Sequence, residues 1–187
     1  ASIPIEGAFE RCEWIVPRKT VLELQRLLEE SDTPVKMEVA PNQVRFTFAQ
    51  VEFISKRVDA KFPDFQRVIP QGYARTFQIG HAAFQQALAR SAILTTDQFK
   101  GVRCLIAPSR LKIISTNADH EEAQEELEID YAGEPADIGL NVSYLLDMLT
   151  HVKAETLQFS FSDASAGVLF TLPDNENFKY VVMPMRV

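Results

Sequence analysis

The sequence predicts an α+β protein assembled from one structural unit that occurs three times. In each occurrence a β-prone segment precedes an apolar stripe of helical period, and three further β-prone segments follow. The composition suits a packed core, because 46% of the 187 residues are apolar, with 13 phenylalanines and 7 glycines. Two such units can pair about a pseudo-twofold axis, with antiparallel sheets outside and helices side by side inside.

The first unit begins with a short predicted strand at residues 13–16. Pro17 then stands where a helix tolerates proline, in its first turn. The apolar stripe of this helix consists of Val21, Leu24, Leu27 and Leu28. Three strands are expected after it, at residues 35–39, 44–48 and 51–55, with Pro41 and Asn42 in the first turn.

The second unit opens with a predicted strand at residues 76–79, which Gly80 ends. The following helix carries an apolar side made of Phe84, Ala87, Leu88 and Ala92. Its three strands are expected at residues 101–106, 111–116 and 125–131, and Pro108 and Ser109 form the turn between the first two.

The third unit opens at residues 137–140, and either Asn141 or Ser143 can cap its helix. The helical stripe consists of Val142, Leu145, Leu146, Leu149 and Val152. The three closing strands are expected at residues 156–161, 167–172 and 178–183.

The repeat predicts the domain organisation. The second and third units complete one domain at residues 71–187, and residues 61–70 form a proline-containing linker. Residues 1–60 hold a single unit, so we expect an incomplete domain with exposed apolar surface and lower stability, and a chain that begins inside a domain.

Charge and cysteine content restrict the class of protein. The net charge is −7, so binding to DNA would require basic residues gathered on one face. Cys12 and Cys104 lie in apolar segments, and we expect them to be buried thiols of a reducing compartment. No apolar run spans a membrane and residues 1–10 do not resemble a signal peptide, which predicts a cytosolic protein.

No residue pattern in the sequence indicates catalysis or a cofactor. His81, His120 and His151 are isolated from other metal-ligating residues. The carboxylates of residues 121–130 lack the glycine turn of a calcium loop, so a solvated strand edge is the expectation. An enzyme with an unrecognised carboxylate site is the least favoured function.

The last residues, 180–187, are apolar although chain ends are usually polar. Residues 180–183 predict a strand that Pro184 stops. Two interpretations stay open on the pattern alone: the last strand of the core, or a surface where flexible methionines dock partners.

Five short motifs occur in order: IVPRK at residues 15–19, KFPDF at 61–65, FKGVR at 99–103, NVSY at 141–144 and YVVMPMR at 180–186. On these motifs and the repeat, the chain resembles the bacterial DNA polymerase III β subunit family, the replicative sliding clamps. The resemblance implies a DNA-clamp fold, with residues 1–60 as the second half of the middle domain and 71–187 as the C-terminal domain. It also implies a non-catalytic processivity factor, without cofactor, that forms a homodimeric ring around double-stranded DNA.

The resemblance further implies a cleft that binds short peptides of polymerase subunits, the clamp loader and repair polymerases. The matching positions are Pro63, Arg67, Val68, Asn141, Tyr144, Val181, Val182, Met183, Pro184, Met185 and Arg186. Their apolar, aromatic and arginine side chains suit an extended peptide. The alternative function is an isolated peptide-binding module that does not encircle DNA.

Two smaller sets of residues also follow from the resemblance. DNA-facing candidates are Arg18, Lys19, Lys100 and Arg103, which are otherwise ordinary solvated charges. Ile93 and Leu94 match the subunit interface, or else they cap the core of their own domain.

Overall fold

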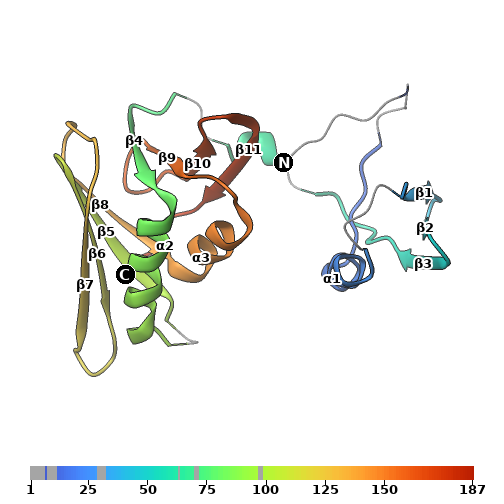
Figure 1. The fold of residues 1–187 in the computed structure, drawn as a ribbon, viewed down its shortest axis with the longest axis horizontal. Helices are drawn as coiled ribbons and strands as arrows, with labels where there is room; N and C mark the ends of the chain where they lie inside the picture. Colours follow the sequence, from blue (N-terminus) through green and yellow to red (C-terminus); the bar gives the residue numbers. More distant parts are fainter. Residues whose placement is uncertain (1–6, 8–11, 29–32, 63, 70–71, 97–98) are drawn as a thin grey trace. The chain divides into compact units, whose positions relative to one another are not determined.

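The computed structural model describes residues 7, 12–28, 33–62, 64–69, 72–96 and 99–187. Contacts divide the chain into two compact units, one of residues 66–187 and one of residues 6–65. Each unit is an α+β structure with antiparallel sheets and few helices, which confirms the predicted fold class (Figure 1).

The 66–187 unit contains two repeats of the predicted element order. The first repeat consists of β4 (Arg75–Gly80), α2 (His81–Ser91), the 3-10 turn η2 (Ala92–Leu94), β5 (Gly101–Ala107), β6 (Arg110–Thr116) and β7 (Glu122–Glu128). The second consists of β8 (Ala136–Asn141), α3 (Val142–His151), β9 (Thr156–Phe161), β10 (Val168–Leu172) and β11 (Asn175–Val182).

The two repeats exchange their opening strands. One sheet has the order β7-β6-β5-β8 and the other β11-β10-β9-β4. β4 therefore pairs with β9 of the second repeat, with Phe77 opposite Phe159, and β8 pairs with β5 of the first, with Ile138 opposite Cys104. Helices α2 and α3 lie side by side between these sheets (Figure 1). Neither sheet is complete without both repeats, so the unit is one cooperative structure.

The core of this unit is rich in phenylalanine rings. Phe159 is fully buried, and its ring centroid lies 4.8 Å from those of Phe77 and Phe170. The predicted helical stripes are largely buried, including Phe84 and Leu88 of α2. In α3 the stripe differs at one position: Met148 is buried, and Leu146 is only partly buried.

Two strands, β7 (Glu122–Glu128) and β11 (Asn175–Val182), begin three residues before their predicted starts. β7 lies at residues 122–128 instead of 125–131, since it pairs with β6 from Glu122 onward. Asn117 sets this register, because its side-chain oxygen accepts hydrogen bonds from the amides of Asp119 and Glu121. Because glutamate has low strand propensity, the residue pattern did not predict a strand at the start of β7. β11 likewise starts at residue 175, three residues before the predicted start.

The 6–65 unit contains one repeat: α1 (Arg18–Leu27), β1 (Lys36–Val39), β2 (Gln43–Phe48) and β3 (Val51–Lys56). Its three strands form one antiparallel sheet in the order β1-β2-β3. The predicted strand at residues 13–16 is not formed; only an isolated bridge joins Ile15 to Val58. In the 66–187 unit each opening strand pairs with the sheet of the other repeat. Because the described residues of the 6–65 unit form one repeat, residues 13–16 have no such sheet to pair with. A short 3-10 turn, η1 (Phe65–Arg67), lies at the unit boundary.

The two cysteines differ, so the expectation that both are buried is wrong. Cys104 is completely buried in the 66–187 unit, and Cys12 is exposed. Burial, with a smaller contribution from Asp137, raises the pKa of the Cys104 thiol to about 12. Cys104 is a structural thiol of low reactivity.

Candidate partner-binding site

The first turn of α3 is held by the residue before it. The Asn141 side-chain oxygen accepts hydrogen bonds from the amides of Ser143 at 2.9 Å and Tyr144 at 3.3 Å, so Asn141 caps the helix and Ser143 does not. Tyr144 is 55% exposed, and its carbonyl accepts a 3.0 Å hydrogen bond from the hydroxyl of Tyr180. This bond joins β11 to the start of α3 beside an exposed aromatic side chain.

The chain end changes character within three residues. Val182 is buried opposite Val168 on β10 and belongs to the core. Val181 is half-buried, whereas Met183 is 57% exposed. Beyond β11, Pro184 and Met185 are half-buried, and the Met185 amide donates a 2.9 Å hydrogen bond to the carbonyl of Gly139 in β8. The chain is therefore core at Val182 and a partly exposed segment held against β8 after it, and the binding of partners at this segment stays a prediction.

The remaining predicted peptide-site residues lie before β4 and at the chain end. Arg67, in η1, and Val68, which follows it, are both exposed, Val68 by 46%. Arg186 is exposed. Pro63 lies outside the described residues. Within the 66–187 unit, hydrogen bonds to β8 and β11 thus connect Asn141, Tyr144 and the tail.

The four predicted DNA-facing residues occupy different environments. Arg18 and Lys19 begin α1 and are exposed, and Lys100 is half-buried just before β5. Arg103 alternates with the buried core residues Val102 and Cys104, so it lies on the sheet face opposite the core. Its guanidinium bonds the Asp137 carboxylate, at 2.5 Å for the shorter contact. Arg103 therefore lies on the sheet face away from the helices, and its assignment as a DNA-facing residue stays a prediction.

Helices α2 and α3 carry little positive charge on their exposed positions. Arg90 is the arginine of α2, and it makes a two-pronged contact with Glu125 of β7 at 2.6 and 2.7 Å. On α3 the exposed charged residue is Asp147. The contact of Glu125 with α2 was not predicted, because the glutamates were expected to form a solvated strand edge that touches no helix.

Ile93 and Leu94 end the first repeat's helical segment in η2. Ile93 is 78% exposed, so it does not cap the core of its own domain. Leu94 is half-buried and lines a hollow of about 550 Å³ together with Phe99, Ile114 and Val187. This end of the unit presents apolar side chains to solvent.

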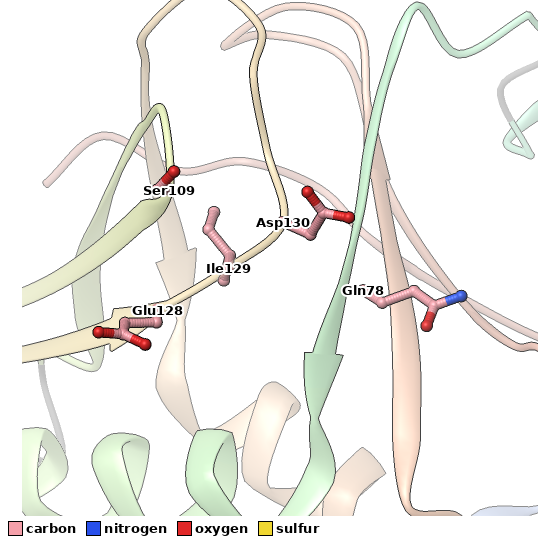
Figure 2. A pocket seen from close by; sticks show the side chains of 5 residues that line it. All are labelled: Gln78, Ser109, Glu128, Ile129 and Asp130. Atoms are coloured by element: carbon pink, nitrogen blue, oxygen red, sulfur yellow. The ribbon is translucent and has the colours of Figure 1, made fainter.

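A second hollow of about 460 Å³ lies where β4 passes the turn between β5 and β6. It is lined by Gln78, Ser109, Glu128, Ile129 and Asp130, and Figure 2 shows the two carboxylates directed away from each other. Among the described residues no group of three or more His, Cys, Asp or Glu could hold a metal ion. The acidic residues here do not converge on a ligand.

Comparisons with known proteins identify this class of fold. Family models of the DNA polymerase III beta subunit match the chain twice: the central domain at residues 2–64 and the C-terminal domain at residues 66–186. The Vibrio cholerae beta sliding clamp is 41% identical over 187 residues, which is 100% of this chain and 51% of that protein. The chain thus spans about half the length of the curated relatives it matches.

Solved structures agree. A Pseudomonas aeruginosa sliding clamp bound to griselimycin has a TM-score of 0.88 at 40% identity, covering 95% of this chain and 48% of that one. A Caulobacter crescentus beta sliding clamp has a TM-score of 0.92 at 36% identity, covering 99% and 50% respectively. The fold is that of a sliding clamp. The chain belongs to the DNA polymerase III beta subunit family.

No helix in the described parts of the chain is both long and apolar enough to cross a membrane.

Proposed function

We propose that this chain is part of a DNA sliding clamp, a non-catalytic processivity factor that encircles double-stranded DNA and tethers polymerases to it. The observation that carries the proposal is the match to beta sliding clamps along the whole chain, in sequence and in fold. The whole protein forms a homodimeric ring in the bacterial cytoplasm. Binding by such a ring is topological, so it requires no base-specific contact.

In this proposal residues 1–60 are the second half of the middle clamp domain, residues 61–70 the linker and residues 71–187 the C-terminal domain. Two findings support the division: the family models change over between residues 64 and 66, and the contact units divide at the same place. Ile93 and Leu94 contribute to the subunit interface, a role supported by the 78% exposure of Ile93.

The peptide site consists of Pro63, Arg67, Val68, Asn141, Tyr144 and the tail from Val181 to Arg186. An exposed tyrosine and an exposed methionine beside an ordered tail suit a short apolar peptide. Polymerase subunits, the clamp loader and repair polymerases are the expected partners.

Griselimycin, the compound bound to the Pseudomonas aeruginosa clamp, is the probe for ligand binding by this chain, and a tail deletion tests whether it binds at the proposed site. Calorimetric titration should show saturable binding, and deletion of residues 183–186 should weaken it by at least about tenfold, since a few central contacts dominate such interfaces. Asp174→Ala, at an exposed turn position between β10 and β11, is the matched control and should bind as wild type. Absence of binding in a folded wild-type chain would contradict the proposed site.

A second candidate is a peptide-binding module without a DNA role, favoured by the small positive charge on α2 and α3. A labelled duplex titrated at several salt concentrations distinguishes the two. In the clamp proposal, Arg18→Glu with Lys19→Glu weakens DNA binding and lowers its salt dependence. Griselimycin binding without any salt-dependent DNA binding would favour the second candidate.

A further inference from the structure

Two glycines lie beside each other on the outer face of the β7-β6-β5-β8 sheet. Gly139 of β8 is paired with Arg103 of β5, and Gly101 of β5 is paired with Asn141 of β8. Both glycines alternate along their strands with core residues, namely Val102, Ile138 and Leu140. They therefore leave a shallow strip of bare backbone on the face away from the core.

The C-terminal tail occupies this strip. The Met185 amide bonds the Gly139 carbonyl at 2.9 Å. A methyl group at Gly139 would overlap the backbone oxygen of Met185 and a methyl of Val187, and one at Gly101 would lie 3.0 and 3.2 Å from the Val187 methyls. Neither glycine has a positive φ, so the approach of the tail, and not backbone conformation, requires glycine at position 139 and favours it at position 101.

The strip is directly connected to the candidate site. Asn141, the register partner of Gly101, caps α3 and holds the amide of Tyr144. Past β11 the tail contains Pro184, which has no amide hydrogen to donate. The hydrogen bond from the Met185 amide to the Gly139 carbonyl therefore fixes the path of the tail just after this proline. The same strand pair thus orders the tail and the start of α3.

We propose that Gly101 and Gly139 are positioning residues that hold the C-terminal tail in a glycine slot, so that Met183 and Pro184 are presented to a partner peptide beside Tyr144. The part of this inference that concerns the partner rests on the proposed function; the docking of the tail does not. Gly139 has the larger role, because its methyl would meet backbone, which cannot move aside as a side-chain methyl can.

The first test is Gly139→Ala in the full chain, with two readouts. Exchange of the Met185 amide, measured by NMR, should accelerate by at least about tenfold on loss of its hydrogen bond. Griselimycin affinity should fall by a similar factor, while exchange in β9 and β10 stays at the wild-type rate. The matched control is Gly80→Ala, because a methyl at Gly80 meets nothing within 4 Å.

The second test separates docking of the tail from general damage to the sheet. Gly101→Ala should loosen the tail less than Gly139→Ala does, and adding Val187→Ala should restore slow Met185 exchange because it removes the two methyls that the new Cβ crowds. Val187→Ala should not rescue Gly139→Ala, whose clash with the Met185 backbone oxygen remains. If the glycine substitutions simply destabilised the sheet, Val187→Ala would not restore slow exchange in one variant and fail in the other. If Gly139→Ala does not fold, Gly101→Ala with and without Val187→Ala provides the test.

The outcomes are distinct. If the Met185 amide of Gly139→Ala exchanges at the wild-type rate, the proposed glycine slot is wrong. A released tail with unchanged griselimycin affinity overturns the positioning role. If the wild-type chain does not bind griselimycin at all, the proposed function and the positioning role fail together, while accelerated exchange would still establish the docked tail.

Discussion

Helices α1 and α3 carry similar apolar stripes, yet only α3 is buried. α3 buries Val142, Leu145, Met148 and Leu149, whereas the buried residue of α1 is Thr20, which shares a 2.6 Å hydrogen bond with Ser55. In α1, Val21 is 49% exposed and Leu27 40%. The difference is the second repeat: α3 has α2 and two sheets around it, while the described residues of the 6–65 unit form one sheet and one α-helix. An amphipathic stripe predicts a helix, but burial depends on what faces it.

The opening strands repeat the same lesson. β4 pairs along six residues with β9, whereas residues 13–16 make one bridge. The 66–187 unit therefore buries most of its described apolar residues, whereas ten large ones are exposed among the described residues of the 6–65 unit: Val21, Leu22, Leu27, Leu28, Val35, Met37, Val39, Ile54, Val58 and Phe62. We expect the two units to differ in stability, and the following predictions test that difference.

The two cysteines give the largest expected contrast. A thiol reagent at about pH 8 should label Cys12 at once and Cys104 at least about 10³-fold more slowly, because a buried thiol reacts only when its unit opens. The raised pKa of Cys104, about 12, works in the same direction by depleting the thiolate. Cys12→Ser should leave a single slow thiol. Equal labelling rates would mean that the 66–187 unit opens as easily as the other.

Urea unfolding should separate the units. Trp14 is the one tryptophan and lies in the 6–65 unit, so its fluorescence reports that unit. We expect its transition at lower urea than exchange of the β5 and β9 amides, with an unfolding free energy smaller by about 5 kcal/mol. Residues 71–187 expressed alone should keep the later transition. Coincident transitions would instead indicate one cooperative structure.

Ring truncation compares the two cores directly. Phe159→Ala should lower the unfolding free energy of its unit by about 3–5 kcal/mol, since the ring is fully buried among Phe77, Phe161 and Phe170. Phe53→Ala in the 6–65 unit should cost about 1 kcal/mol, because that ring is only partly buried and meets one other ring, Phe46, at 6.5 Å. If urea titration shows that both substitutions lower the unfolding free energy by similar amounts, the two cores do not differ as proposed.

Helix capping distinguishes α3 from α1 on a smaller scale. Asn141→Ala should destabilise the 66–187 unit by about 1 kcal/mol, because the amides of Ser143 and Tyr144 lose their acceptor. Pro17, at the start of α1, provides no side-chain cap. Ser143→Ala is the control and should be nearly neutral; a larger effect at Ser143 would reverse the assignment of the cap.

The smallest effect concerns ion pairs and pH. The hydrogen bond from Arg90 lowers the pKa of Glu125, and the hydrogen bond from Lys36 lowers that of Glu38 in the other unit. A lowered carboxyl pKa stabilises the folded state above the ordinary carboxyl pKa, and this contribution disappears as the pH falls through the folded-state value. Thermal unfolding should show a slight advantage of wild type over Glu125→Gln at neutral pH and none in acid. If the difference in thermal stability between wild type and Glu125→Gln persists in acid, its cause is side-chain packing and not the ion pair.

Much of the architecture was accessible from the residues alone. The stripes at Phe84, Leu88 and Leu145, and the turn at Pro108, predicted both helices and the succession of helices and strands along the 66–187 unit, since these patterns arise from local periodicity and backbone preference. The five motifs were sufficient to predict the family, which the comparisons confirm.

The tertiary structure decided what long-range pairing controls. Which sheet β4 joins, whether Cys12 is buried, which way Arg103 faces and where Glu125 finds a partner all depend on residues far away in the sequence. Glycine in a strand signals close approach of other backbone, but the sequence does not say of which segment. That Gly139 receives the chain's own C-terminus is visible only once the strands have exchanged, because local sequence sets the form of each element and packing selects its neighbours.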